Sequence, residues 1–135
     1  MTVFVDTAGI VALLSKADAH HDDAVAAWRR LLATRTRLVT SDLVVAEATV
    51  VVRARAGFET SFRAAEQLLT DPFEVVWLDP PLMTEALRLY RRHADHTLSL
   101  CDCVSFAIMR RRRIEVAFTY DDDFDTLGFR RARAE

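Results

Sequence analysis

Two kinds of hydrophobic pattern alternate along the chain. Short runs rich in β-branched residues are typical of buried strands, and longer stretches with apolar residues three and four positions apart are typical of helices. The predicted strands are VFV (3–5), LVT (38–40), FEVVWL (73–78) and IEVAF (114–118), with FRRARA (129–134) as a weak edge strand. The predicted helices cover 8–16, 21–33, 41–56, 60–70, 80–94 and 100–112. This alternation indicates an α/β fold, with a mostly parallel sheet of four to five strands covered by helices on both faces.

Local chemistry supports several of these boundaries. Ser41 and Thr60 are suited to the N-cap position, where a side-chain oxygen accepts a hydrogen bond from the first helical turn. Gly57 is suited to a helix C-terminus, and Pro80 and Pro81 to a first helical turn. These residues therefore predict where the helices begin and end.

Composition narrows the class of protein. A chain of 135 residues that is 51% hydrophobic is expected to form one compact domain over 1–135. The net charge of −2 gives no general attraction to nucleic acid, so such a partner would need a local patch or bound metal. Cys101 and Cys103 are predicted to be small buried hydrophobes. No membrane span or signal peptide is predicted, which favours a cytoplasmic protein that does not contact the membrane.

Acidic residues lie next to the predicted strands. Asp6 ends the first strand, Glu47 lies in the second turn of the helix after the second strand, and Asp102 opens the helix before the fourth. The run DDDFD (121–125) follows that fourth strand. Because ligands bind beyond the carboxyl ends of parallel strands, these acids are expected to meet at one edge of the sheet. Two carboxylates about 4 Å apart repel by roughly 4 kcal/mol near a protein surface, so the cluster either spreads into water or binds a cation.

Each acid also has a structural alternative. Asp6 could cap the following helix, and Asp102 could interact with the positive end of its own helix. Glu47 lies in an almost unbroken apolar stretch, where a carboxylate needs either an ion or a partner such as an arginine. These alternatives stay open at the level of sequence.

The aspartate run does not match a calcium-binding loop. Such a loop starting at Asp121 needs Gly at its sixth position and Glu at its twelfth, where this chain has Thr126 and Ala132. Asp121 is the first aspartate after the strand and is the best candidate for a metal ligand, with Asp123 next. The two remaining aspartates, predicted to be solvated loop residues, are Asp122 and Asp125.

Basic residues and histidines give weaker signals. Arg110–Arg113 is predicted to be a solvated helix end on the opposite side of the sheet from the acids. Arg53 and Arg55, at the far end of their helix from its N-terminus, are disfavoured as a substrate clamp for a similar reason. His20 and His21 suggest a metal-free nuclease as a rival mechanism, but we expect them to cap and solvate the start of a helix. No Walker loop and no G-x-S-x-G elbow is present.

Five stretches together resemble a known family. In chain order they are FVDTAGIVALL (4–14), HHDDAVAAW (20–28), TSDLVVAEA (40–48), LSLCDCVSFAIM (98–109) and AFTYDDDF (117–124). The chain resembles PIN-domain ribonucleases of the VapC toxin type, found in bacterial toxin–antitoxin pairs. The resemblance extends over nearly the whole chain.

This resemblance implies a three-layer α/β/α PIN-like fold and Mg²⁺- or Mn²⁺-dependent endonuclease action on RNA. It also implies a homodimer and a cognate antitoxin that covers the active site. The residues that match the family's metal-binding and catalytic acids are Asp6, Glu47, Asp102 and Asp121, with Asp123 at a position that assists in metal binding.

Two positions depart from the family pattern. Ala8 replaces a frequent serine, and Cys101 replaces the threonine or serine that usually precedes the aspartate at 102. A lost hydroxyl could weaken a hydrogen bond to a metal ligand, although every acid is retained. The alternative function is therefore a catalytically weak PIN-like domain that binds RNA or a partner protein.

Overall fold

A computed structural model describes residues 1–134 and contains one five-stranded sheet. All strands pair in parallel, in the order β3-β2-β1-β4-β5. The strands are β1 (Thr2–Val5), β2 (Arg37–Ser41), β3 (Phe73–Val76), β4 (Val116–Phe118) and β5 (Arg130–Arg131). The prediction of a parallel sheet is confirmed, including the weak edge strand near the C-terminus.

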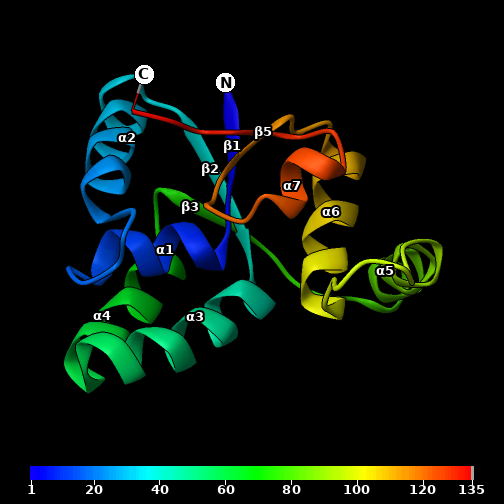
Figure 1. The fold of residues 1–135 in the computed structure, drawn as a ribbon, viewed down its shortest axis with the longest axis horizontal. Coiled ribbons are helices and arrows are strands. Elements are labelled where there is room, and N and C mark those ends of the chain that lie inside the picture. Colours follow the sequence, from blue (N-terminus) through cyan, green and yellow to red (C-terminus); the bar gives the residue numbers. More distant parts are fainter. Residues whose placement is uncertain (135) are drawn as a thin grey trace.

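Helices cover both faces of the sheet. They are α1 (Thr7–Leu14), α2 (His21–Ala33), α3 (Asp42–Ala56), α4 (Phe58–Leu68), α5 (Pro80–Arg92), α6 (Leu100–Arg112) and α7 (Asp123–Thr126). In Figure 1, α1, α2 and α4 lie on one side of the strands and α5 and α6 on the other, which confirms the three-layer α/β/α arrangement. The four-residue helix α7 was not predicted.

The helix boundaries confirm most of the sequence signals. Ser41 caps α3, because its hydroxyl accepts a hydrogen bond from the amide of Val44. The prediction that Thr60 caps the next helix is wrong, because α4 begins at Phe58. Gly57 ends α3 and precedes α4 directly, and its φ of 90° is a conformation that a side chain disfavours.

The core is centred on the middle strand. Val3, Phe4 and Val5 of β1 are completely buried, because helices pack on both faces of this strand. Helix α6 is buried over the whole stretch 103–109, which includes Cys103 as predicted. Burial on both faces explains why β1 and α6 show continuous apolar runs without clear amphipathic alternation.

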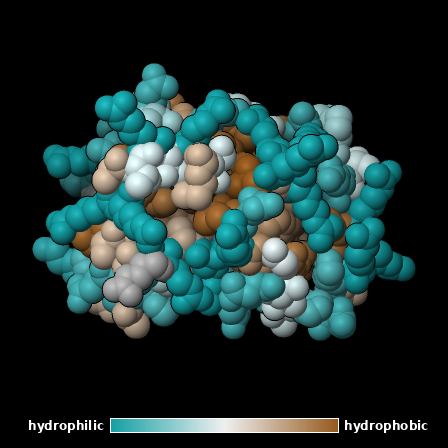
Figure 2. Space-filling model, turned by 90° about the horizontal axis from the view of Figure 1, so that it is seen from above, coloured by the Kyte–Doolittle hydropathy of each residue, from teal (hydrophilic) through white to brown (hydrophobic). Residues whose placement is uncertain are grey.

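The amino ends of the strands lie away from the acidic residues. Figure 2 shows this face from above, with mostly hydrophilic residues around a few hydrophobic ones. Arg112 and Arg113, at the end of α6, lie beside the first residues of the chain, and Arg112 forms an ion pair with Glu74 of β3. The prediction that this arginine run is an exposed helix end on the opposite side from the acids is confirmed.

Helix α1 packs closely against the end of β4. The amide of Asp6 donates to the carbonyl oxygen of Phe118 over 3.1 Å, and a Cβ atom on Gly9 would lie 2.3 Å from that same oxygen. This close approach brings the residues that follow β1 next to the residues that follow β4.

We expect Gly9→Ala to destabilise the protein, because the clash involves the backbone of Phe118 as well as its completely buried ring. Overpacking of this kind costs about 1–3 kcal/mol, which urea-induced unfolding would measure. The matched control is Ala12→Gly in the same helix, which creates no clash and is expected to cost about 1 kcal/mol. An unchanged unfolding midpoint for Gly9→Ala would contradict the close approach of α1 to β4.

Candidate active site

A pocket of about 330 Å³ opens at the carboxyl ends of the strands. It is lined by residues from α1, the α1–α2 connection, α3, α6 and the segment after β4. Its acidic residues include all four that the sequence predicted to meet, namely Asp6, Glu47, Asp102 and Asp121. The sheet therefore brings together side chains that are up to 115 residues apart in sequence.

Asp6 is the most buried of these acids, with 5% of its surface exposed. It occupies the N-cap position of α1, but its side chain makes no capping hydrogen bond. Instead, its Oδ2 accepts a hydrogen bond of 2.7 Å from the hydroxyl of Thr119. The pKa of Asp6 is raised to about 7, chiefly by burial and also by the nearby charge of Asp102, against the opposing effect of the Thr119 hydrogen bond.

The raised pKa of Asp6 predicts how stability changes with pH. Between pH 4 and pH 7 the folded protein keeps a proton on Asp6 that the unfolded chain has lost, so the free energy of unfolding should fall as pH rises through this window. The expected loss from this group is about 4 kcal/mol. Urea unfolding of the metal-free protein at several pH values would measure it, with Asp6→Asn as the control that loses this part of the slope. Identical pH profiles for the two proteins would contradict the burial of Asp6.

Asp102 combines two roles in the first turn of α6. Its Oδ2 accepts a hydrogen bond from the amide of Ser99, and the Ser99 hydroxyl accepts one from the amide of Asp102, both over 3.0 Å. This capping box confirms that Asp102 supports its own helix. Burial raises the pKa of Asp102, as do the charges of Asp121 and Glu47, while the hydrogen bonds with Ser99 lower it.

The residues after β4 form a chain of hydrogen bonds. The amide of Asp121 donates to the Thr119 hydroxyl over 3.1 Å, and the amide of Asp123 donates to Oδ1 of Asp121 over 2.9 Å. One oxygen from each of Asp102, Asp121 and Asp123 lies within 4.8 Å of the others. Burial raises the pKa of Asp123, and the charges of Asp121 and Asp102 add to this effect.

The remaining two aspartates of the run point elsewhere. Asp122 and Asp125 are exposed, as predicted, and Asp125 forms an ion pair of 2.9 Å with Arg131 of β5. They lie at the cap and within the short helix α7, not in an extended loop. They therefore take no part in the pocket.

Glu47 reaches the pocket from the second turn of α3 and is half-buried. The alternative of a paired arginine is not supported, since none of the ion pairs within residues 1–134 involves it. Its neighbour across the pocket edge is Cys101, whose pKa is raised by burial and then by the charge and hydrogen bond of Glu47. The Cys101 thiol therefore stays protonated at neutral pH.

The structure also adds residues that the sequence did not predict. Thr119 links Asp6 to Asp121 through hydrogen bonds to both. Tyr120, which lies between Thr119 and Asp121 in the sequence, lines the pocket. A hydroxyl at the end of a buried strand, two positions before an aspartate, was a signal that could have identified Thr119.

The prediction for the two histidines is confirmed in part. His20 is exposed and occupies the N-cap position of α2, but its side chain makes no capping hydrogen bond. Its ring stacks on Tyr120 and lines the pocket, while Nδ1 of His21 lies 2.8 Å from the carbonyl oxygen of Ala12. The prediction that Arg55 lies away from the acids is wrong. Arg55 also lines the pocket, because it forms an ion pair with Asp18 of the α1–α2 connection. The side chain crosses from the C-terminal part of α3 to a segment 37 residues earlier.

Comparisons with known proteins agree with this geometry. The family model described as the PIN domain matches residues 3–130. The chain is 33% identical over 134 residues to the 23S rRNA-specific endonuclease VapC20 of Mycobacterium tuberculosis, in both strain CDC 1551 / Oshkosh and strain ATCC 25618 / H37Rv, covering 98% of this chain and 99% of the relative.

Solved structures show the same fold. The crystal structure of M. tuberculosis VapC20, described as a sarcin-ricin loop cleaving toxin, has a TM-score of 0.87 at 31% identity and covers 97% of this chain and 98% of its own. VapBC2 from Rickettsia felis, bound to a DNA fragment from its promoter, has a TM-score of 0.69 at 14% identity, with 97% of each chain covered, which supports the fold alone. The sequence motifs, the three-layer α/β/α fold and the acidic pocket thus have one explanation: the chain belongs to the PIN-domain family.

Proposed function

We propose that this protein is a divalent-metal-dependent endoribonuclease that hydrolyses phosphodiester bonds of RNA and acts as the toxin of a toxin–antitoxin pair. The observation that carries this proposal is the convergence of Asp6, Glu47, Asp102 and Asp121 on one pocket. The family and the activity named for the similar VapC20 proteins support the same function. Because those relatives are named for 23S rRNA, we propose ribosomal RNA as the substrate class.

The acidic side chains in and next to the pocket fit a hard divalent cation. Asp102, Asp121 and Asp123 offer carboxylate oxygens, which are the ligands that Mg²⁺ and Mn²⁺ prefer. Asp6 is buried with a raised pKa, so its charged form needs a compensating positive charge. We propose that Asp6, Glu47, Asp102 and Asp121 hold the cation and that Asp123 assists.

The role of the chain in catalysis is to hold the cation in place before substrate arrives. When bound there, the cation would lower the pKa of an attacking water and stabilise charge that develops on the phosphate. Thr119 fixes Asp6 through its hydroxyl and at the same time anchors the backbone that carries Asp121. The capping box fixes Asp102, so one oxygen faces Ser99 and the other is available to a cation. These contacts reduce the reorganisation needed when RNA binds.

We also propose that the protein forms a homodimer and binds a cognate antitoxin. Apolar side chains are exposed along α3 and α4, namely Val50, Phe58, Phe62 and Leu69. Such a group favours contact with another protein surface. Light scattering of the purified protein tests the dimer, and co-purification with the product of a neighbouring gene tests the antitoxin.

A chelation experiment tests the enzymatic proposal. Purified protein is incubated with ribosomal RNA in Mn²⁺ or Mg²⁺, and the products are mapped before and after addition of EDTA. We expect cleavage that stops with EDTA and resumes with excess metal. Absence of cleavage in every metal would support the alternative of a binding domain, and cleavage that continues in EDTA would support a mechanism based on histidine.

A further inference from the structure

The acids form only part of the pocket wall. Besides α1, another part of the wall comes from the α1–α2 connection, the C-terminal half of α3 and the residue that precedes Asp121. The side chains on this wall are Asp18, His20, Val51, Arg55 and Tyr120. A ring pair and a guanidinium are not typical ligands of a hard cation, so this wall needs a different explanation.

The two rings form an ordered stack. The centroids of His20 and Tyr120 lie 4.5 Å apart with an angle of 13° between the planes. The Tyr120 hydroxyl donates to the carboxylate of Asp23 over 2.5 Å, and the amide of His20 donates to Asp18 over 2.8 Å. Tyr120 is half-buried whereas His20 is exposed. The imidazole is therefore held in place by the stack on Tyr120 and still presents accessible surface at the pocket.

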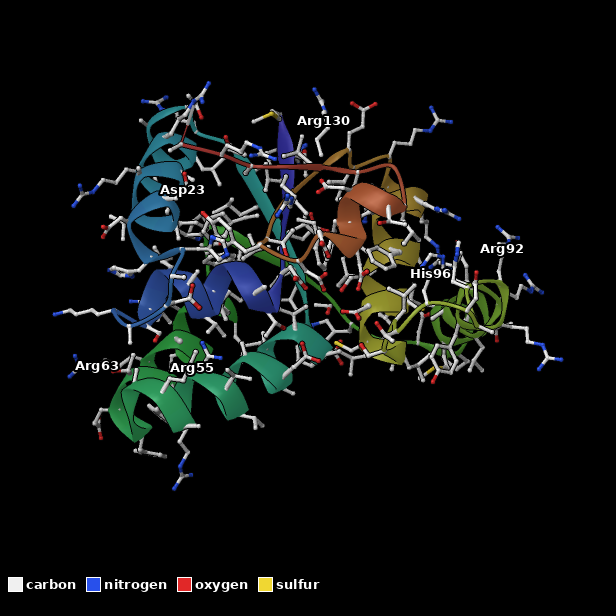
Figure 3. All side chains as sticks on the ribbon, in the orientation of Figure 1. Asp23, Arg55, Arg63, Arg92, His96 and Arg130 are labelled. Carbon is white, nitrogen blue, oxygen red and sulfur yellow. The ribbon has the colours of Figure 1, made fainter. Side chains whose placement is uncertain are left out.

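Arg55 carries positive charge to the same wall. Its Nη1 lies 3.3 Å from Oδ2 of Asp18, and 51% of its side chain remains exposed. A guanidinium has five N–H donors, so one contact with Asp18 orients the group and leaves other donors free. Figure 3 places Arg55 on the side of the molecule formed by α1 to α4, whereas Arg92 and His96 lie on the side of α5.

We propose that His20, Tyr120 and Arg55 form a subsite for the nucleotide next to the cleaved phosphodiester bond. The base of this nucleotide stacks on the exposed surface of His20, and Arg55 binds a neighbouring phosphate. Because Tyr120 directly precedes Asp121, the ring stack lies one residue from the acidic cluster. The inference rests on the proposed function and specifies its substrate.

The chemistry of the subsite selects unpaired RNA. A base can stack on a side chain only when it is free of its own helical stack, as in loops, bulges and single strands. Stacking on an aromatic side chain strengthens binding about 5- to 100-fold per base and tolerates different bases. Arg55 also offsets the repulsion between the phosphate backbone and the surrounding carboxylates.

Binding of a fluorescein-labelled, unstructured ten-nucleotide RNA in EDTA tests the subsite without cleavage. We expect His20→Ala to weaken binding about tenfold and Arg55→Gln about fivefold or more. His20→Phe, which keeps a stacking surface, should stay within about threefold of the wild type. The RNA with an abasic nucleotide at the contact position should bind wild type and His20→Ala equally.

Matched controls come from residues outside the pocket. Arg53, on the same helix, places its guanidinium 5.2 Å from the ring centroid of Phe58, and His96 belongs to the α5–α6 connection. Arg53→Gln and His96→Ala should bind RNA like the wild type. Equal binding by His20→Ala, Arg55→Gln and these controls would overturn the subsite.

Cleavage in Mn²⁺ separates the subsite from the proposed activity. In the subsite variants we expect a raised KM with an unchanged Mn²⁺ affinity by calorimetry. Reduced Mn²⁺ affinity would overturn the subsite in favour of a role in metal binding. If the wild type binds RNA without cleaving it, and the subsite variants bind it more weakly than the wild type, the subsite holds and the proposed function fails. If the wild type cleaves and the variants match the controls, the proposed function holds and the subsite fails.

Discussion

Asp102→Asn is expected to reduce RNA cleavage by at least about 100-fold while leaving the fold intact. Mutation of a residue that only supports a metal ligand already lowers metal affinity or activity by about 10- to 100-fold, and Asp102 is proposed to be a ligand itself. An asparagine oxygen can still accept the hydrogen bond from the Ser99 amide, so the capping box remains. Because burial raises the pKa of Asp102, removal of its charge should leave the melting temperature of the metal-free protein unchanged or higher.

Asp102→Ala is the matched comparison for that variant. It removes both the charge and the acceptor for Ser99, so it should also lose about 0.5–2 kcal/mol of stability. Calorimetric melting with and without Mn²⁺, together with cleavage rates, would measure both effects. Wild-type cleavage by Asp102→Asn, or a large loss of stability in its metal-free form, would show that Asp102 serves only its helix.

Thr119→Val is expected to have the second largest effect, because one hydroxyl serves two acids. Valine has nearly the same shape but cannot donate to Asp6 or accept from the amide of Asp121. A half-buried amide left without a partner costs about 1–3 kcal/mol. Mn²⁺ affinity should fall about 10- to 100-fold, because Asp6 and Asp121 lose their common support.

Thr40→Val is the control for the buried hydroxyl. Thr40 and Thr119 are both completely buried, but the Thr40 hydroxyl donates to the backbone carbonyl of Val5 over 2.9 Å and not to an acid. It should therefore lose stability with little change in Mn²⁺ affinity. Urea unfolding and titration calorimetry would separate the two effects. An equal loss of Mn²⁺ affinity in both variants would contradict the positioning role of Thr119.

The overall fold could be predicted because its strands have a local signature. The buried runs around Phe4 and Val39 indicate parallel strands, and the adjacent caps and prolines indicate where the helices begin. Helix α7 was missed because four residues, two of them aspartates, carry too short a pattern for hydrophobic periodicity. The start of α4 was misplaced because Gly57 ends one helix and begins the next without a loop.

The acids of the pocket could be predicted from their order along the chain. Asp6 directly follows a strand and Asp121 comes soon after another, and parallel strands end at the same edge of a sheet. Their proximity could therefore be predicted although they are far apart in the sequence. The additional hydrogen bonds of Asp102 with Ser99 show that a helix-capping role and a place in the pocket are compatible.

The part of the pocket wall that contains Arg55, His20 and Tyr120 could not be predicted in the same way. Arg55 lies near the C-terminus of α3, which sequence order placed far from the pocket, but the Asp18 ion pair depends on the path of the α1–α2 connection. His20 likewise reaches Tyr120 across 100 residues. Such contacts follow from the packing of helices on each other, not from hydrophobic periodicity.

The most direct test of the metal centre is an anomalous diffraction measurement on crystals grown with Mn²⁺. An anomalous difference peak bounded by the carboxylates of Asp6, Glu47, Asp102 and Asp121, absent in crystals of Asp102→Asn, is the result we predict. A fully ordered pocket without such a peak at saturating Mn²⁺, or with the only peaks elsewhere on the protein, would contradict the proposal that these acids hold the catalytic cation.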